Sequence, residues 1–311
     1  MKYVVGVDLG GTQLRAVLID RDADLLAYQR TDTAAECGPT AVIAQIEQLI
    51  TMVTAQVDRQ DVVGIGVGTP GPLDPFDGIV LEAPNLAGWI NVPLKALLQE
   101  RTGLPVTVGN DANAAGLGEW RFGSGRGCQD FVYVTISTGI GGGVIAQGKL
   151  LLGSKGMAGE VGHMTIQMDG PLCGCGNFGC WEVVASGTAL ARTAQGALER
   201  GHQSLIKEIA ASSPVEGWHI AAAAERGDTL AQTLMRREGE LIGVGLVNLL
   251  HLYSPERIAL GGGVTKSIAH WEPYMRSVVE ERAMLPYRTA TINLATLGDN
   301  VGVIGAAALV L

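Results

Sequence analysis

The sequence contains one local pattern twice: an apolar strand runs into a glycine-rich turn, and a second strand follows. The first copy covers residues 3–19, with D-L-G-G-T at 8–12, and the second covers 131–146, with S-T-G-I-G-G-G at 137–143. β-Branched and aromatic residues fill the apolar runs, as is typical of buried strands. We therefore interpret the chain as two copies of one α/β core.

Strand and helix patterns alternate along the rest of the chain, which favours mainly parallel or mixed sheets covered by helices. Asp228 is expected to cap the longest helix, whose apolar second half we expect to be buried between the domains. A helix with Pro93 in its first turn is expected in residues 91–101. The remaining strands are expected at 25–30, 62–67, 105–108 and 257–260, and the remaining helices at 40–57, 112–117, 186–200, 228–253 and from Asp299 or Asn300 to the C-terminus.

Glycine-rich tips follow three of the predicted strands, at residues 8–12, 138–139 and 261–263. Ligands of such sheets bind at the carboxyl ends of strands, and a Gly-Gly tip lets backbone N–H groups approach phosphate. Thr12 adds a hydroxyl donor, and Asp8 offers a hard oxygen to magnesium. One tip alone would also suit a plain hairpin turn, whereas three suggest a nucleotide held from both sides. Neither a P-loop nor a well-formed G-x-G-x-x-G is present.

The pair Asn110-Asp111 also follows a predicted strand. A carboxylate at such a place can accept the proton of a hydroxyl as its oxygen attacks phosphorus. The alternative is that Asp111 caps the helix that follows. The sequence pattern leaves both roles open.

A cluster of potential metal ligands lies between Glu160 and Glu182, with His163 near its start and three of the five cysteines near its end. Thiolates and an imidazole at this spacing are the ligand set of a structural zinc ion. Buried thiols or a disulfide are the alternatives, although a pairing would leave one cysteine over. Glu160 and Glu182 can equally be exposed surface carboxylates. The cysteines of the cluster are Cys173, Cys175 and Cys180.

The charge and the apolar pattern of the chain argue against nucleic-acid-binding, membrane-spanning and secreted classes of protein. The formal net charge is −9 and no basic run stands out, so nucleic acid is an unexpected partner. The apolar run 241–253 is too short to span a membrane, and the acidic first strand does not resemble a signal peptide. A cytoplasmic protein is expected, with Cys37 and Cys128 as ordinary buried thiols.

The motifs together resemble those of the ROK (repressor, open reading frame, kinase) family of sugar kinases along the whole chain. The combination of E-x-G-H with C-x-C-G-x-x-G-C-x-E is specific to that family, whereas G-G-T and T-G-x-G are shared with actin-like ATPases and hexokinases. The matching motifs are D-L-G-G-T at 8–12, P-N-L at 84–86, N-D-A-N-A at 110–114, S-T-G-I-G-G-G at 137–143, E-x-G-H at 160–163 and C-x-C-G-x-x-G-C-x-E at 173–182.

The resemblance implies an α/β fold of two ribonuclease-H-like domains, of the actin-like ATPase and hexokinase superfamily, that close a cleft on ATP and a hexose. We expect the small domain to comprise residues 1–115 and 297–311 and the large domain, with the zinc-binding loop, 116–296. The implied activity is ATP-dependent phosphorylation of glucose at the 6-hydroxyl, with Asp111 as general base and Asp8 helping to place Mg²⁺. The resemblance implies that the sugar ligands are Gly71, Asn85, Asn110, Asp111, Glu160, His163 and Glu182. The implied nucleotide ligands are Asp8, Gly10, Gly11, Thr12, Gln13, Thr138, Gly139, Gly262 and Gly263. The implied structural zinc ligands are His163, Cys173, Cys175 and Cys180.

One position departs from the family pattern: Gln13 stands where a lysine commonly follows G-G-T, which removes a positive charge near the phosphates. A kinase for N-acetylmannosamine, N-acetylglucosamine or fructose is the first alternative. A sugar-responsive repressor is the second, but such proteins carry an N-terminal DNA-binding domain, for which a strand beginning at Tyr3 leaves no room. Family members are often dimers or tetramers, so a homo-oligomer is expected.

Overall fold

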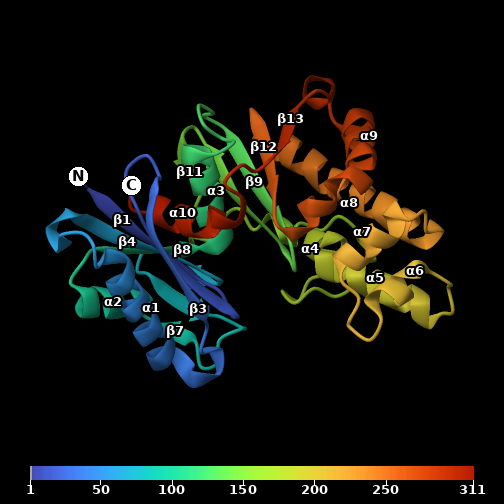
Figure 1. The fold of residues 1–311 in the computed structure, drawn as a ribbon. Helices are drawn as coiled ribbons and strands as arrows, with labels where there is room; N and C mark the ends of the chain where they lie inside the picture. Colours follow the sequence, from blue (N-terminus) through green and yellow to red (C-terminus); the bar gives the residue numbers. More distant parts are fainter. Residues whose placement is uncertain (1) are drawn as a thin grey trace. The chain divides into compact units, whose positions relative to one another are not determined.

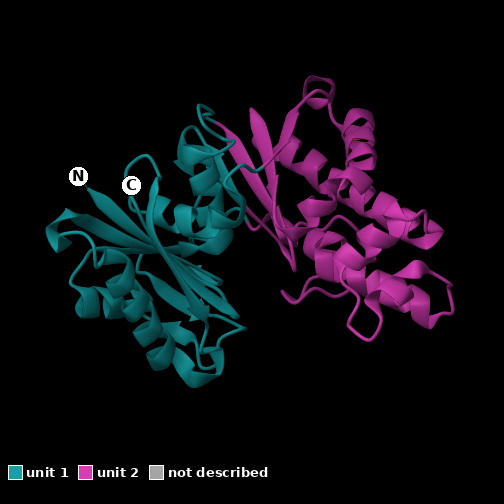
Figure 2. Ribbon diagram, in the orientation of Figure 1, with its two compact units in different colours: residues 1–129, 143–159, 295–311 teal, residues 130–142, 160–294 magenta. Residues whose placement is uncertain are grey.

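The computed structural model describes residues 2–311 and divides into two compact units. Unit 1 comprises the residues up to 129 together with 143–159 and 295–311, and unit 2 comprises 130–142 and 160–294 (Figure 2). The chain therefore passes from one unit to the other four times. The predicted boundary at residue 115 falls within a continuous helix, α3 (Asp111–Phe122), which belongs entirely to unit 1.

Unit 1 is built on a five-stranded mixed sheet in the order β3-β2-β1-β4-β8. The first three strands form the predicted antiparallel meander, whereas β4 and β8 run parallel to β1. The register sets Asp8 opposite Gly68, and Thr69 opposite Asn110, so the carboxyl ends of three parallel strands lie in one row. The strands are β1 (Tyr3–Leu9), β2 (Gln13–Ile19), β3 (Leu25–Asp32), β4 (Val62–Thr69) and β8 (Val106–Asn110).

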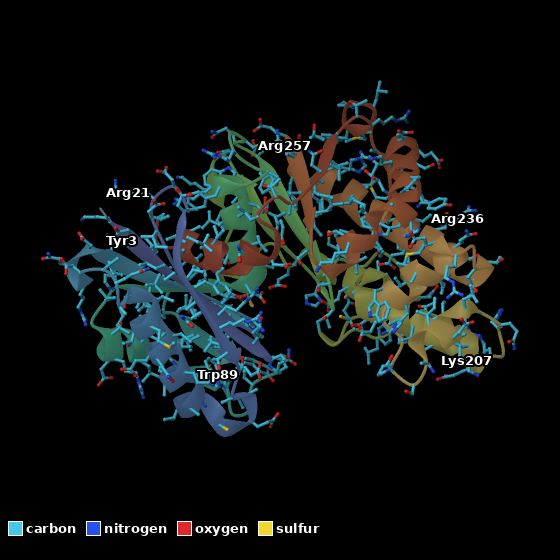
Figure 3. The ribbon with its side chains drawn as sticks, in the orientation of Figure 1. Tyr3, Arg21, Trp89, Lys207, Arg236 and Arg257 are labelled. Carbon is cyan, nitrogen blue, oxygen red and sulfur yellow. The ribbon has the colours of Figure 1, made fainter. Side chains whose placement is uncertain are left out.

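Helices cover both faces of this sheet (Figure 1). On one face α1 (Gly38–Thr54) and α2 (Leu94–Thr102) pack their apolar sides into a core that includes Trp89, which is 1% exposed (Figure 3). On the other face lies α10 (Val301–Ala308), with α3 packed against it. A Cβ atom at Gly66 would lie 1.8 Å from the carbonyl oxygen of Ala306, so glycine is needed for this close helix–sheet approach.

Three short strands form a separate antiparallel sheet in unit 1, in the order β5-β6-β7. They are β5 (Leu73–Asp74), β6 (Ile79–Glu82) and β7 (Ile90–Val92). The predicted helix 91–101 is therefore wrong at its start, because Asn91 belongs to β7 and Pro93 is the N-cap of α2. Proline has no N–H and a fixed φ, which suits this boundary position.

The second five-stranded sheet has the order β11-β10-β9-β12-β13, and the boundary between the two units falls within β10. In unit 2, β9 and β13 both run parallel to β12. The turns after β9 and β12 are the second and third glycine-rich tips. The strands are β9 (Phe131–Ile136), β10 (Ile140–Ala146), β11 (Lys149–Leu150), β12 (Arg257–Gly261) and β13 (Thr291–Leu294).

The longest helix, α8 (Thr229–Tyr253), is the centre of the helical part of unit 2, and Asp228 caps it as predicted. Its second half is buried, but against α9, α4 and other helices of the same unit rather than between domains. Within residues 2–311, no helix is both long and apolar enough to cross a bilayer. The other helices are α4 (Trp181–Ala185), α5 (Gly187–Glu199), α6 (Leu205–Ala210), α7 (Gly217–Glu225) and α9 (Glu272–Arg282).

Two local predictions are corrected. Asn300 occupies the N-cap position of α10 without a side-chain hydrogen bond to the helix, so the last helix begins without the expected side-chain cap. Of the two cysteines expected to be buried, Cys128 is buried and Cys37 is exposed. Cys37 ends a short 3-10 turn none of whose residues is buried.

Candidate functional site

The first glycine-rich tip, between β1 and β2, packs against Asn85. A Cβ atom at Gly11 would lie 2.7 Å from Cβ of Asn85, so the absence of a side chain is required for this approach. Thr33 fixes the tip from the other side, because its hydroxyl donates to the carbonyl oxygen of Gly10 at 2.7 Å. Thr12 and Gln13 remain exposed beside it. Unit 1 therefore brings predicted phosphate and sugar ligands together at one place.

Asn110 and Asp111 lie where β8 runs into α3. Asn110 is the N-cap: its Oδ1 accepts hydrogen bonds from the backbone N–H groups of Ala112 and Asn113, at 2.9 and 3.0 Å. Its amide nitrogen faces the predicted sugar ligand Gly71, where a Cβ atom would lie 3.8 Å from it. Asp111 is the first helical residue and its side chain is exposed, with Oδ1 accepting from the N–H of Ala112 at 2.8 Å. The capping position thus belongs to Asn110.

In unit 2, Glu160, His163 and Glu182 gather around the cysteine cluster. Nε2 of His163 lies 3.9 Å from a Glu160 carboxylate oxygen, while its Nδ1 lies 3.7 Å from the sulfur of Cys173. Partial burial raises the pKa of the Glu160 carboxyl above its usual value; the His163 ring opposes this rise, and the Glu182 carboxylate adds to it. The two ring nitrogens of His163 therefore face different partners, a carboxylate and a thiol.

The four predicted zinc ligands form a compact set. His163, Cys173, Cys175 and Cys180 each offer a ligand atom, and these atoms all lie within 4.8 Å of one another. The sulfur atoms of Cys175 and Cys180 are 3.7 Å apart. Zinc bound to sulfur at about 2.3 Å with tetrahedral angles sets its sulfur ligands about 3.8 Å apart. The donor set and its spacing therefore fit a zinc ion.

The protonation of the cluster agrees with a cation site. Burial raises the pKa of the Cys180 thiol to about 12, and hydrogen bonding to the neighbouring thiols raises it as well. A backbone hydrogen bond at Asn177 lowers the pKa of Cys175. A bound cation would deprotonate its thiol ligands, including Cys180. All five cysteines of the chain are free thiols rather than disulfides.

Glu182 also holds the second glycine-rich tip. Its Oε2 accepts a hydrogen bond from the backbone N–H of Ile140 at 3.0 Å, and a Cβ atom at Gly139 would lie 2.2 Å from that oxygen. The third tip lies beside the second: Gly262 has φ +89°, and its Cβ position would lie 2.4 Å from the carbonyl oxygen of Ile136. Gly262 is therefore required by its positive φ and by its close backbone contact, whereas Gly139 leaves room for the Glu182 carboxylate.

These two tips border a cavity of about 680 Å³ within unit 2. Thr138 and Gly263 line it, which brings two of the predicted nucleotide ligands into one pocket. Cavities of this size are typical of small-molecule sites. The remaining lining residues are Ser137, Gly187, Thr188, Leu190, Ala191, Val215, Glu216, Gly217, Trp218, Ala221, Val264, Lys266 and Ser267.

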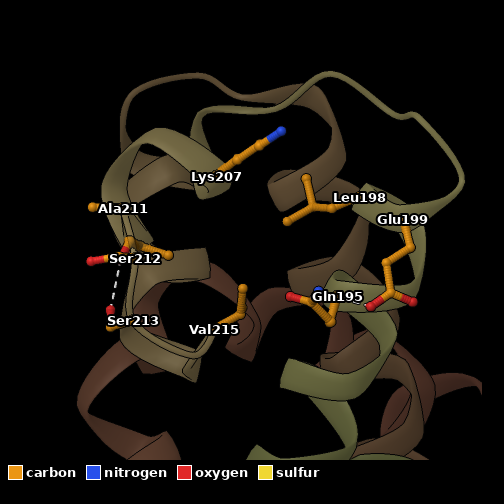
Figure 4. A pocket seen from close by; sticks show the side chains of 9 residues that line it. Gln195, Leu198, Glu199, Lys207, Ala211, Ser212, Ser213 and Val215 are labelled. Carbon is orange, nitrogen blue, oxygen red and sulfur yellow. Dashed lines mark hydrogen bonds between the residues drawn. The ribbon is translucent and has the colours of Figure 1, made fainter.

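A smaller cavity of about 340 Å³ adjoins α5 and α6 and shares Val215 with the first (Figure 4). Its polar lining combines Lys207 with Glu199 and Gln195, so no single charge dominates it. None of the predicted site residues lines this cavity, and we assign it no role.

The lining of the larger cavity by α5 and α7 was missed in the sequence analysis. Gly187, at the start of α5, lies against the second tip: its N–H donates to the carbonyl oxygen of Ser137 at 2.7 Å, and the same atom blocks its Cβ position. A glycine at this position was the one feature of α5 in the sequence that could have indicated the contact. The contribution of α7 was not recoverable, because residues 217–225 carry no motif that marks a ligand site.

The sequence matches the ROK family over residues 4–311. The chain belongs to the ROK family. It is 36% identical to a glucokinase of Thermotoga maritima over 309 residues, covering 99% of this chain and 96% of the relative. It is 31% identical to the xylose repressor of Bacillus subtilis, covering 99% of this chain and 77% of that protein.

Among solved structures, the chain is similar to a ROK family glucokinase from Streptomyces griseus in complex with glucose and AMPPNP. The TM-score is 0.83 at 35% identity, and the match covers 99% of this chain and 98% of the other. The predicted fold class, two α/β domains of the actin-like ATPase and hexokinase superfamily, is that of these ROK kinases and is confirmed.

Proposed function

We propose that this ROK protein transfers the γ-phosphoryl group of ATP to the 6-hydroxyl of glucose. The observation that carries the proposal is the full-length similarity to a ROK glucokinase solved with glucose and AMPPNP, an ATP analogue. The geometry of each unit is compatible with it, since unit 1 presents a carboxylate at a strand end and unit 2 presents a nucleotide-sized cavity.

In unit 1, Asp111 would accept the proton of the sugar 6-hydroxyl as that oxygen attacks the γ-phosphorus atom. The exposed position of its carboxylate at the start of α3 supports this role, although its Oδ1 shares the N–H of Ala112 with the N-cap side chain of Asn110. Asn85, together with Gly71 and the amide nitrogen of Asn110, would bind sugar hydroxyls and orient the reacting one. Positioning of this kind supplies much of the rate enhancement in phosphoryl transfer.

In unit 2, His163 would donate a hydrogen bond from Nε2–H to a sugar hydroxyl, alongside the Glu160 carboxyl. A zinc ion held by Nδ1 of His163 and the three cysteines would be structural, because the protein fills all four of its positions. Its part would be to fix the tautomer and direction of the imidazole ring. Glu182 would bind sugar through Oε1 while its Oε2 holds the tip at Ile140.

The glycine-rich tips would bind the nucleotide. Backbone N–H groups at residues 11–12 and 138–139 would donate to phosphate oxygens, since the N–H of Gly10 already donates to the carbonyl oxygen of Gln13 at 3.0 Å. Mg²⁺, placed with the help of Asp8, would neutralise phosphate charge when bound. Gln13 can donate a hydrogen bond but carries no charge, so phosphate binding would depend on these amides and the metal.

The test is ADP release by the purified protein with Mg-ATP and a panel of glucose, mannose, fructose, N-acetylglucosamine and N-acetylmannosamine. We expect glucose to give the highest kcat/KM. A higher value for an N-acetylated sugar or fructose would replace glucose as the substrate but leave the kinase mechanism standing. No ADP release with any sugar, from folded and zinc-loaded protein, would contradict the proposal.

A sugar-sensing regulator is the second candidate, because the chain is also similar to the xylose repressor of Bacillus subtilis. A sensor would bind sugar without turnover. Calorimetric sugar binding combined with undetectable ADP release would favour this candidate over the kinase.

A further inference from the structure

Trp218, the second residue of α7, lines the 680 Å³ cavity of unit 2 and is 59% exposed. The other four tryptophans also lie in the described range, and none of them is exposed. Trp89, Trp181 and Trp271 are at most 1% exposed, and Trp120 is half-buried. Trp218 is thus the one tryptophan with a large aromatic surface open to a cavity.

The indole of Trp218 is held by its neighbours. Its Nε1–H donates to a Glu216 carboxylate oxygen at 3.1 Å, and its ring lies against the ring of His219, with centroids 3.7 Å apart and planes inclined by 33°. His219 is itself fixed, being 2% exposed and accepting at Nδ1 from the N–H of Glu216 at 2.9 Å. One face of the indole is therefore covered and its polar edge is satisfied. An aromatic group oriented in advance loses little entropy on binding.

The glycine-rich tips line the same cavity, because Ser137, Thr138 and Gly263 border it together with Trp218. A phosphate group at the tips and a planar aromatic group against Trp218 would thus belong to one ligand. A nucleoside phosphate combines these two parts, whereas inorganic phosphate, pyrophosphate and polyphosphate lack the second.

We propose that Trp218 stacks on the base of the nucleotide and that this contact makes an aromatic base part of donor recognition. The inference rests on the proposed function, since it concerns the phosphate donor of the same reaction. Stacking depends on a π-face that every base has, so Trp218 favours nucleotides over base-free donors and discriminates little between adenine and guanine. Loss of one base–aromatic stack weakens binding by about 10- to 100-fold.

Fluorescence tests the contact without relying on activity. ADP is titrated into the purified protein while tryptophan emission and its quenching by iodide are recorded. Because Trp218 is the one exposed indole, we expect ADP to quench the emission and to protect it from iodide. The half-buried Trp120 in α3 of unit 1 offers a matched control. Trp120→Phe should retain both effects, and Trp218→Phe should lose both.

Kinetics then measure the contribution to donor choice. Trp218→Ala should raise KM for ATP by about 10- to 100-fold, and Trp218→Phe, which keeps a ring, should raise it much less. The slow turnover expected with polyphosphate should not change in either variant, because no base is lost. A polyphosphate kcat/KM equal to that of ATP in the unaltered protein would overturn the proposal.

The two proposals fail in different ways. Turnover of glucose with ATP, combined with Trp218 emission that ADP leaves unchanged and an unaltered KM in Trp218→Ala, would overturn the stacking contact and leave the kinase standing. ADP-dependent quenching that disappears in Trp218→Phe, in a protein that phosphorylates no sugar, would support the stacking contact and remove the kinase.

Discussion

Asp8 and Arg15 face one another across the β1–β2 hairpin and form an ion pair. The guanidinium engages Oδ2 of Asp8 and also donates to the main-chain oxygen of Asp299, at 2.9 Å, just before α10. Oδ2 points toward α10, since a Cβ atom at Gly302 would lie 2.6 Å from it. Arg15 thereby fixes the rotation of the carboxylate, and under the proposed function Oδ1 would be the oxygen for Mg²⁺ or its water.

The first prediction follows from this pair. Arg15→Met should raise the free Mg²⁺ concentration needed for half-maximal ADP binding and turnover by several-fold, because the carboxylate loses its fixed orientation. Arg30→Met is the matched control, because Arg30 lies opposite Arg15 on β3 and is exposed. Calorimetry of ADP binding at several Mg²⁺ concentrations measures the effect. A lower Mg²⁺ requirement in Arg15→Met would mean that Arg15 competes with the metal, which is the opposite role.

A second prediction separates the roles of two adjacent residues. Asp111→Asn should retain sugar binding but lower kcat by about 10²- to 10⁴-fold, the contribution of a general base. Asn110→Ala should lower the free energy of unfolding by about 1 kcal/mol, because it removes the side-chain cap of α3, and should also weaken sugar binding, because it removes the amide nitrogen. Calorimetric sugar binding, steady-state kinetics and denaturant unfolding check both variants. Near-normal kcat in Asp111→Asn would exclude Asp111 as the base.

The sequence was sufficient for strands whose burial is nearly continuous, such as β1, β4, β9 and β12, but not for the short strands β5, β6, β7, β11 and β13. The apolar run of β1 and the Gly-Gly tip after it could only be read as a buried strand ending at a turn, and the structure confirms both. The helix predicted at 91–101 began wrongly because Asn91 adopts a positive φ of 52° in a short strand, which side-chain periodicity does not reveal. Similarly, the second half of α8 was read correctly as buried, but its apolar surface does not say which helices cover it.

The residues of the candidate site could be predicted where they belong to a sequence motif. They could not be predicted where only tertiary packing brings them to the site. The histidine and cysteines between residues 163 and 180 have chemistry that few other roles require, and their ligand atoms do come together. Trp218 had no such signal, because its role depends on the cavity formed by α5, α7 and the two tips. The capping of α3 by Asn110 rather than Asp111 was also undecided, since Asn and Asp have similar preferences for that position.

The third prediction concerns metal content. We expect about one zinc ion per chain in protein purified without chelators, from the single set of four ligands. Cys180→Ser should lower the zinc content to near zero and reduce thermal stability, because the buried Cys180 and its neighbours hold the loop through the ion. Cys37→Ser, at an exposed cysteine outside the cluster, should change neither quantity. Elemental analysis that finds no zinc in freshly purified, folded protein would contradict the site.

The last prediction concerns Glu238, which is buried in α8 at 2% exposure. Its Oε1 has no hydrogen-bond partner among the described residues. Burial raises the pKa of this carboxyl well above its usual value of 4.5, and the charge of Arg237 opposes the rise only in part. The folded protein therefore binds this proton more tightly than the unfolded chain does.

This difference gives stability a definite pH dependence. The stabilisation from Glu238 protonation is fully present below pH 4.5, the ordinary pKa, and is lost as the pH rises toward the raised pKa of the folded state. Each pH unit between these values removes about 1.4 kcal/mol of stability.

Glu238→Gln cannot ionise, so its free energy of unfolding should fall less than that of the unaltered protein between about pH 5 and about pH 8. Glu240→Gln, at an exposed carboxylate paired with Arg236, is the control and should leave the slope unchanged. Urea unfolding at both pH values measures these slopes, and equal slopes in the unaltered protein and Glu238→Gln would show that Glu238 does not govern this pH dependence.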